Sequence, residues 1–106
     1  MTIAEHLRKA HAFVELGWCQ HHTALQANGY PTTPKSKLAC QWCMMGALYA
    51  ALPPEAPRED LIPCLRLLRK VVRTTHISKW QDKKGRTQKQ VLRVFDKAFL
   101  LAETQS

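Results

Sequence analysis

The residues best suited to chemistry in this chain are its basic side chains, which gather in the second half. Residues 61–97 contain eleven Lys or Arg and two acidic residues, whereas the rest of the chain has five basic and six acidic residues. Several cations bind phosphates or carboxylates better than one, because their fields add and counterions are released. The candidate anion-binding surface consists of Arg66, Arg69, Lys70, Arg73, Lys83, Lys84, Arg86, Lys89, Arg93 and Lys97.

The spacing of these residues favours helical faces. The four basic residues between 66 and 73 lie at offsets of three, four and seven, and the three between 89 and 97 lie at offsets of four. Because the formal net charge is +8, we expect a small non-enzymatic binding module for an anionic partner: nucleic acid, a nucleotide or an acidic protein surface. The simpler interpretation is that the charges only keep two amphipathic helices in solution.

Four cysteines offer a second chemistry, metal binding or nucleophilic attack. Cys40 and Cys43 form a CxxC pair, Cys19 and Cys64 each lie twenty-one residues from it, and histidines occupy 21–22. Zinc sites usually use two closely spaced pairs, so zinc binding is the less favoured alternative. A catalytic Cys19 would need a base and an oxyanion hole, and the sequence fixes neither. We therefore expect no metal, no cofactor and no enzymatic activity.

The N-terminal residues and the longest apolar run bear on the compartment. Residues 1–13 carry charges where a signal peptide needs an apolar core, so we expect a cytoplasmic protein with free thiols. The uncharged run 38–52 would reach about 22 Å as a helix, short of the roughly 30 Å core of a bilayer. We therefore expect no membrane partner.

This run, LACQWCMMGALYAAL, is the centre of the predicted fold. Ala, Leu and Met favour helix, and a run that is apolar on every face indicates a helix surrounded by others. Ser36 is the expected cap of this helix, and the pair Pro53-Pro54 would end it. The CxxC pair is thereby placed on a buried helix.

A first helix is predicted over 2–16. Thr2 and Glu5 fit a capping box, and Gly17 fits a C-terminal stop. On this helix His6 and His11 are expected to lie at the surface.

Two further helices follow the central run. One begins near Asp60 and ends by His76, and the last opens at Thr87, which forms a second capping box with Gln90. Between them, 77–86 is expected to be a loop in which Trp80 closes the core.

These elements predict an all-α protein: a compact bundle of about four helices around 38–52, forming a single domain over 1–106. The Asn28-Gly29 pair allows a short hairpin near 24–33.

Three separated motifs resemble a small uncharacterised helical domain family, of unknown function, found in actinomycete-type bacteria and their phages. They are GWCQ at 17–20, WCMMGAL at 42–48 and WQDKKGRT at 80–87. Gln81 and Gln90 stand where the family pattern has Asn and Glu, and Cys40 and Cys64 have no counterpart in it.

The resemblance implies that the motif residues gather in one place and line a candidate pocket. These residues are Trp18, Cys19, Trp42, Cys43, Trp80, Asp82 and Arg86. It also implies an alternative function, a phage-type accessory effector that binds a host protein or captures a nucleotide signal through this pocket.

Overall fold

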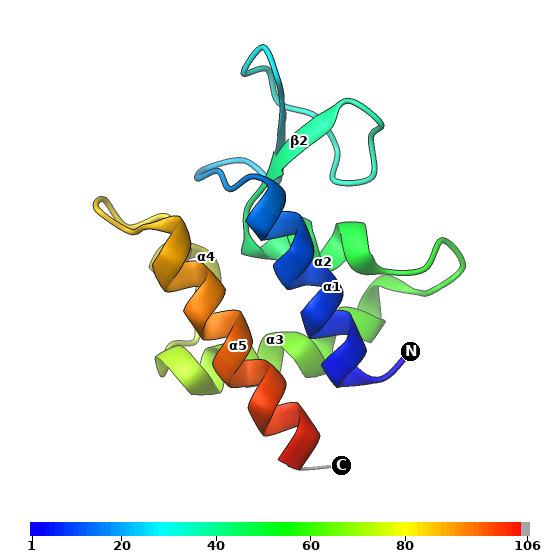
Figure 1. Cartoon of the computed structure of the whole chain (residues 1–106), viewed down its shortest axis with the longest axis vertical. Helices are drawn as coiled ribbons and strands as arrows, with labels where there is room; N and C mark the ends of the chain where they lie inside the picture. The colour runs from blue at the N-terminus through cyan, green and yellow to red at the C-terminus, as the bar shows by residue number, and fades with distance from the viewer. Residues whose placement is uncertain (105–106) are drawn as a thin grey trace.

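The computed structural model describes residues 1–104 and contains five α-helices, one 3-10 helix and a two-stranded antiparallel sheet (Figure 1). The elements are α1 (Ile3–Leu16), β1 (Ala24–Gln26), β2 (Ala39–Trp42), α2 (Met44–Ala51), η1 (Arg58–Leu61), α3 (Ile62–Val72), α4 (Ile77–Gln81) and α5 (Gln88–Thr104). The protein is therefore mainly helical, and the prediction of an all-α fold is correct only in part because of the small sheet.

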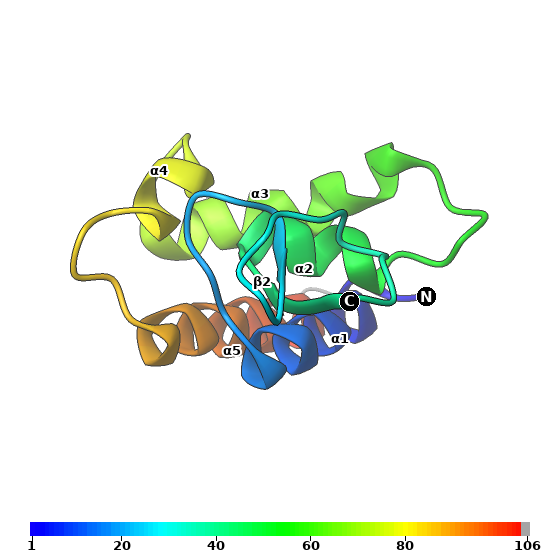
Figure 2. The same ribbon diagram turned by 90° about the horizontal axis from the view of Figure 1, so that it is seen from above.

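The helices form two layers with α2 between them. Seen from above, α1 and α5 lie side by side in one layer, and α3 and α4 lie in the other (Figure 2). The core fills the space between the layers and includes Leu7, Leu48, Leu68 and Phe95, each at most 1% exposed. Among the described residues, no helix is long and apolar enough to cross a bilayer.

The predicted capping box is confirmed in full at α5, whereas at α1 only the bond to the Thr2 hydroxyl is present. The hydroxyl of Thr2 accepts a hydrogen bond from the Glu5 amide at 3.1 Å and opens α1, which Gly17 caps at its other end. At α5 the bonds are reciprocal: the Thr87 hydroxyl accepts from the Gln90 amide, and the Gln90 side chain accepts from the Thr87 amide. These local signals were readable because each joins residues three apart.

The predicted central helix 38–52 is wrong in its first half. Residues 39–42 form β2, and α2 begins only at Met44, with Cys43 as its N-cap. Ser36 caps no helix; its hydroxyl accepts a hydrogen bond from the Leu38 amide instead. The predicted end is correct, since α2 stops before the proline pair.

Tertiary contacts explain why the run divides. β2 pairs with β1, with Ala24 opposite Trp42, so its amide and carbonyl groups are satisfied outside any helix. A Cβ on Gly46 would lie 1.8 Å from the Thr23 carbonyl oxygen, so α2 packs directly against the chain that leads into β1. Backbone pairing with a distant segment has overridden the local preference for helix.

The hairpin expected near 24–33 is present as a tight turn. The Gln26 amide donates to the Tyr30 carbonyl at 2.9 Å, and Gly29 has a φ of +86°, which favours glycine. Its returning arm makes only an isolated bridge between Leu25 and Pro31. The main partner of β1 is therefore β2, not the residues just after the turn.

Two further expectations need correction. Residues 77–81 of the predicted loop form the short helix α4, which gives five helices in place of about four. His6 is 3% exposed, and its Nε2 donates to the Leu48 carbonyl at 2.9 Å near the end of α2. His11 is half-buried, with its Nε2 3.3 Å from the Asp96 carboxylate.

Candidate functional site

Three distant segments meet at one end of α2, as the motif pattern predicts. Trp18 and Trp42 form a parallel bridge, in which the Trp42 amide donates to the Gly17 carbonyl at 3.0 Å. The Cys19 amide donates to the Trp42 carbonyl at 3.2 Å. The C-terminus of α4 completes the group through Gln81.

Gln81 is the centre of this arrangement and is 1% exposed. Its Oε1 accepts hydrogen bonds from the Trp18 indole at 2.5 Å and from the Met44 amide at 3.1 Å. Its Nε2 donates to an Asp82 carboxylate oxygen at 2.6 Å. One side chain thus joins the 18–20 motif, the start of α2 and the end of α4.

Asp82 and Gln20 extend the network to the surface. An oxygen of Asp82 accepts from the His21 amide at 3.0 Å, and the other lies 3.9 Å from the His21 imidazole. The Gln20 side chain donates to the carbonyls of Gln81 and Lys83, each at 3.0 Å. We call Trp18, Gln20, His21, Gln81 and Asp82 the polar clamp, because together they fasten the chain after α1 to the end of α4.

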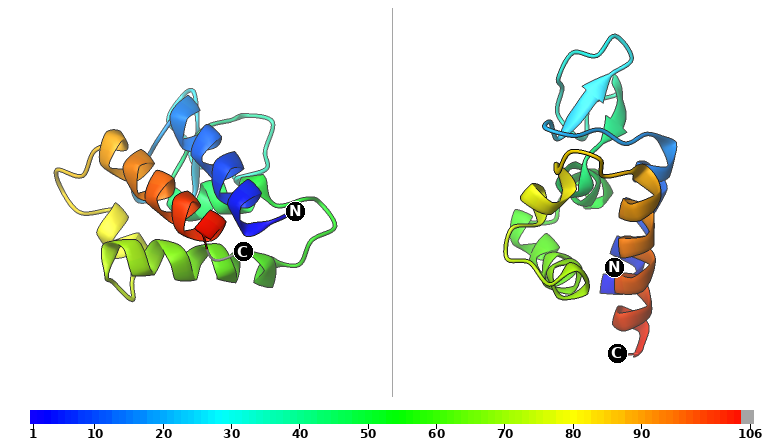
Figure 3. Two further views of the ribbon diagram at one scale, coloured as in Figure 1. Left: turned by 60° about the horizontal axis from the view of Figure 1, so that its bottom comes forward. Right: turned by 90° about the vertical axis from the view of Figure 1, so that its left-hand side faces the viewer.

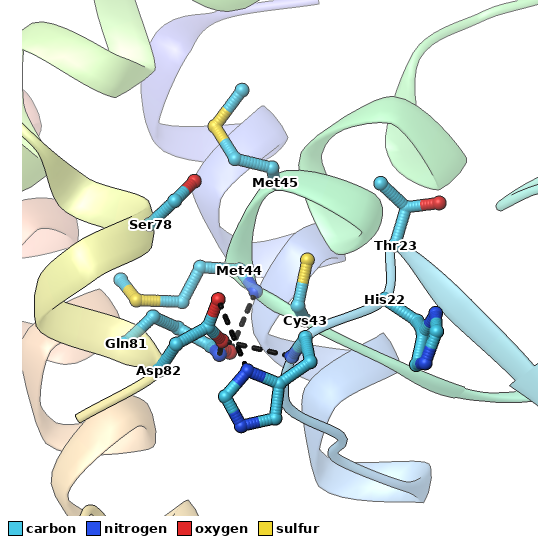
Figure 4. Close-up of a pocket in the computed structure, with 9 residues that line it drawn as sticks. His22, Thr23, Cys43, Met44, Met45, Ser78, Gln81 and Asp82 are labelled. Carbon is cyan, nitrogen blue, oxygen red and sulfur yellow. Dashed lines mark hydrogen bonds and ion pairs between the residues drawn. The ribbon is translucent and has the colours of Figure 1, made fainter. Parts of the chain in front are cut away.

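A small cavity opens beside the polar clamp (Figure 4). Its volume is about 130 Å³, and it is lined by His21, His22, Thr23, Cys43, Met44, Met45, Ser78, Gln81 and Asp82. Of the residues proposed to line a pocket, it therefore contains Cys43 and Asp82. Pockets for drug-sized ligands measure about 300–1,000 Å³, so this cavity suits a molecule much smaller than a nucleotide.

The remaining predicted pocket residues lie around the site and not in the cavity. Trp42 is a core residue that meets the Phe13 ring edge-on, with centroids 4.9 Å apart, and donates to the Pro34 carbonyl at 3.0 Å. The Arg86 guanidinium stacks over the Trp80 ring at 3.8 Å, and its Nε donates to the Trp80 carbonyl at 2.9 Å. This stack closes the turn between α4 and α5.

The cysteines occupy four different environments. Cys40 is exposed on β2, so the CxxC pair does not lie on a helix. Cys43 caps α2, its Sγ accepting from the Gly46 amide at 3.3 Å. Cys19 is buried and donates to the His22 carbonyl at 3.4 Å. Cys64 is buried against the Ile3 carbonyl.

Burial controls the acidity of the buried thiols. Loss of hydration raises the pKa of Cys64 to about 12. The same effect, with smaller contributions from Cys43, Asp82 and Cys40, raises the pKa of Cys19 to about 12. Burial also raises the pKa of Cys43, against the hydrogen bonds that Sγ accepts at the start of α2. At neutral pH only a small fraction of each of these three thiols is therefore ionised to the nucleophilic thiolate.

The candidate metal ligands among the described residues do not come together around one point. Within residues 1–104, no group of three or more His, Cys, Asp or Glu side chains is placed to hold an ion. The separate positions of Cys40 and Cys64, one on the exposed strand and one under α1, account for this.

The predicted basic residues divide between the two layers. Those of α3 and those of α5 lie at exposed positions, opposite the buried faces by which each helix meets the core. Because α3 and α5 belong to different layers, their outward faces are not continuous along the whole length of the helices (Figure 2). α4 and the turn after it connect the end of α3 to the start of α5 along one side of the molecule (Figure 3).

The role of Gln81 was missed from the sequence. It was noted only as a departure from the expected Asn, and its position inside the WQD motif was the one available signal. Gln88, whose side chain donates to the Val14 carbonyl at 2.7 Å and joins α5 to α1, gave no signal at all. Neutral amides carry no charge pattern, so only their three-dimensional partners reveal them.

Comparison with known proteins supplies a family but no activity. No curated protein and no solved structure matches this chain. A family model described as a family of unknown function (DUF6197) matches residues 1–99. This match includes all three motifs and every residue of the polar clamp. The chain therefore belongs to this family of unknown function.

Proposed function

We propose that the protein is a small non-enzymatic binding module that holds an extended polyanion, of the kind presented by a nucleic acid backbone, against one edge of the molecule. The supporting observation is the position of its charge. Residues 69–93 contain nine Lys or Arg and one acidic residue, and the rest of the chain contains seven of each. The formal net charge of +8 therefore belongs entirely to this segment.

These residues lie along one side of the fold, which we call the basic edge. It comprises the end of α3, α4, the turn after it and the start of α5, which the right-hand view of Figure 3 shows face-on. Its cations are Arg69, Lys70, Arg73, Lys79, Lys83, Lys84, Arg86, Lys89 and Arg93. All are exposed except Arg86, which is half-buried against Trp80.

The positive field of this edge is not cancelled by nearby carboxylates. The ion pairs recorded between described residues join His11 to Asp96 and His21 to Asp82, and neither involves Lys or Arg. Asp82, the one acidic residue of the segment, already accepts hydrogen bonds from His21 and Gln81. Like charges left together in this way are attractive to a polyanion, because binding releases its condensed counterions.

The spread of the cations favours an extended partner over a single nucleotide. They are distributed over three helices and a turn, and the small cavity beside the polar clamp contains none of them. Trp80, the aromatic ring of the basic edge, is covered by Arg86 and offers no open stacking platform. Contacts would go mainly to the backbone, with little dependence on base sequence.

The accessory-effector alternative has less support. Capture of a nucleotide by the motif residues requires them to line a common pocket, yet the rings of Trp42 and Trp80 face the core and Arg86 respectively. Binding of a host protein through the basic edge would remain compatible with its charge. An acidic protein surface is therefore the competing partner, and the following experiment distinguishes it from a nucleic acid.

Fluorescence anisotropy with a short labelled DNA duplex tests the proposal. If four phosphates are neutralised, affinity should fall about 100-fold between about 50 and 200 mM salt. Two duplexes of unrelated sequence should bind alike. Absence of binding at low salt would contradict the nucleic acid proposal and favour an acidic protein partner.

Two double variants of equal charge change locate the binding surface. Lys83→Glu with Lys84→Glu reverses two exposed cations of the basic edge, and Lys9→Glu with Lys37→Glu reverses two exposed cations elsewhere. The first pair should weaken binding by more than about tenfold, and the second should have a much smaller effect. Equal losses would mean that net charge, and not the basic edge, attracts the duplex.

A further inference from the structure

We propose that Cys19 and Cys43 are a redox-responsive pair, which closes to an intramolecular disulfide when a small peroxide enters the cavity beside the polar clamp. The inference concerns a site separate from the basic edge. It rests on backbone pairing, on the different positions of the two cysteines relative to the cavity and on the size of the cavity.

The backbone places these two cysteines next to each other. Trp18 and Trp42 are bridge partners on parallel segments, and the Cys19 amide is bonded to the Trp42 carbonyl. Each cysteine follows its tryptophan by one residue, so the two cysteines occupy matching positions on adjoining segments. Paired segments lie about 4.8 Å apart. This falls within the roughly 4.4–6.8 Å between Cα atoms that a disulfide spans.

The environments of the thiols assign them different roles. Cys43 lines the cavity, so a small oxidant that enters the cavity meets this residue first. Cys19 is 6% exposed and lies outside the set of residues that line the cavity. Cys43 is therefore the thiol attacked first, and Cys19 is the thiol that resolves the intermediate.

The cavity also selects the oxidant by size. About 130 Å³ accommodates a few water-sized molecules, and hydrogen peroxide is only slightly larger than water. A bulky disulfide such as oxidised glutathione does not fit this volume. The proposed co-reactant is therefore a hydroperoxide of the smallest kind.

The reaction balances in two steps. The Cys43 thiolate attacks one oxygen of hydrogen peroxide, the O–O bond breaks, and hydroxide leaves as a sulfenic acid forms. The Cys19 sulfur, giving up its proton, then attacks the Cys43 sulfur and expels hydroxide, which becomes water. Two electrons pass from the thiols to the peroxide, which is reduced to water.

The acidity of the thiols sets the rate. Burial raises the pKa of both cysteines, so only a small fraction of Cys43 is thiolate at neutral pH. The reaction should accordingly be slow, and its rate should rise about tenfold per pH unit between pH 7 and 8. A pair with this behaviour responds to sustained oxidant and not to brief exposure.

Disulfide formation would change contacts at the site. It withdraws the Cys43 sulfur from the Gly46 amide at the start of α2 and the Cys19 sulfur from the His22 carbonyl. The segment 19–23, which supplies three residues to the cavity wall, would then be tied covalently to α2. Oxidation thereby alters the cavity without touching the basic edge.

Peptide mapping after treatment with hydrogen peroxide tests the pair. Cleavage at Lys and Arg places Cys19 in the peptide 10–35 and both Cys40 and Cys43 in the peptide 38–58. The experiment therefore uses the Cys40→Ser variant, which removes an exposed thiol and leaves Cys43 as the only cysteine in its peptide. The oxidised protein should lose the mass of two hydrogen atoms, remain monomeric in this treatment and yield the two peptides linked.

The matched variant is Cys43→Ser in wild-type protein. A serine hydroxyl can accept the Gly46 hydrogen bond, so the cap of α2 is retained while the reactive sulfur is lost. No link to peptide 10–35 should then form. A link through Cys40 in this variant at the wild-type rate, or peroxide treatment of Cys40→Ser that only adds oxygen to separate thiols, would overturn the proposal.

Discussion

The polar clamp and the basic edge adjoin each other, but they differ in whether their polar groups have partners within the protein. In the clamp, Gln81 uses both ends of its amide, and Asp82 accepts hydrogen bonds from two donors. Among the described residues, no buried side-chain nitrogen or oxygen lacks a hydrogen-bond partner. Along the basic edge, nine cations share a segment with one carboxylate, which the clamp already engages.

This difference separates residues that hold the fold from residues available to a partner. A buried group whose hydrogen bonds are all made inside the protein stabilises the folded state and has little left to offer a ligand. Exposed cations without carboxylate partners contribute little to stability, but their fields add outside the molecule. Changes in the clamp should therefore alter stability, and changes at the edge should alter binding.

The largest effect is expected where backbone meets backbone beside the clamp. Gly46→Ala would place a Cβ 1.8 Å from the Thr23 carbonyl oxygen, and neither chain can move without breaking the pairing of β1 with β2. We expect a loss of more than about 3 kcal/mol in the free energy of unfolding, measured with urea. Gly29→Ala is the control, because its Cβ would meet nothing within 4 Å. Its positive φ should cost only about 1–2 kcal/mol.

Gln81→Leu tests whether the clamp is held by one amide. The change keeps similar volume but leaves the Trp18 indole and the Met44 amide without their acceptor. At roughly 1–3 kcal/mol for each orphaned donor, we expect a loss of about 3 kcal/mol by urea unfolding. Gln26→Leu, at a half-buried position in β1, is the matched control and should change stability little. Equal stability of the two variants would refute the central role of Gln81.

The buried thiols predict how stability depends on pH. The pKa of Cys19 and of Cys64 is raised to about 12 in the folded protein, from about 9. Between these values the unfolded chain loses protons that the folded protein keeps, so stability falls as pH rises above about 9. Each thiol contributes at most about 1.4 kcal/mol per pH unit. Urea unfolding at pH 8 and pH 10 should show a smaller decrease for Cys64→Ala than for wild type.

Expectations based on near neighbours in the sequence were the accurate ones. Three of them depend on a few adjacent residues: the cap at Thr2, the capping box at Thr87 and the stop at Pro53. The division of 38–52 into β2 and α2 depends instead on pairing with residues thirteen to eighteen positions away. Nothing in an uncharged Ala-, Leu- and Met-rich run records such a partner, so local propensity gave helix throughout.

At the site, too, the sequence predicted some features and not those that depend on distant partners. The motifs correctly indicated that residues near 18, 42 and 81 gather, and they named Cys43 and Asp82, which line the cavity. They did not indicate which side chains turn inward. The tryptophans at 42 and 80 were assigned to the pocket, but ring packing against Phe13 and Arg86 directs them elsewhere. His6 was assigned to the surface because nothing near it in the sequence indicates its hydrogen-bond partner. That partner, the Leu48 carbonyl, lies forty-two residues away.

Arg86 belongs to the basic edge but also makes structural contacts with Trp80, next to Gln81 of the polar clamp, and its replacement should give the smallest and most specific effect. Arg86→Lys keeps the positive charge of the basic edge but removes the planar group that stacks on Trp80 and the Nε bond to the Trp80 carbonyl. We expect a stability loss of only about 0.5–1 kcal/mol, because the stack is half-exposed. Duplex affinity at low salt should change less than twofold if phosphates sense charge alone. A large loss of affinity with unchanged stability would instead make Arg86 a specific ligand contact, and its contacts with Trp80 would then serve to position it for the ligand and not to hold the fold.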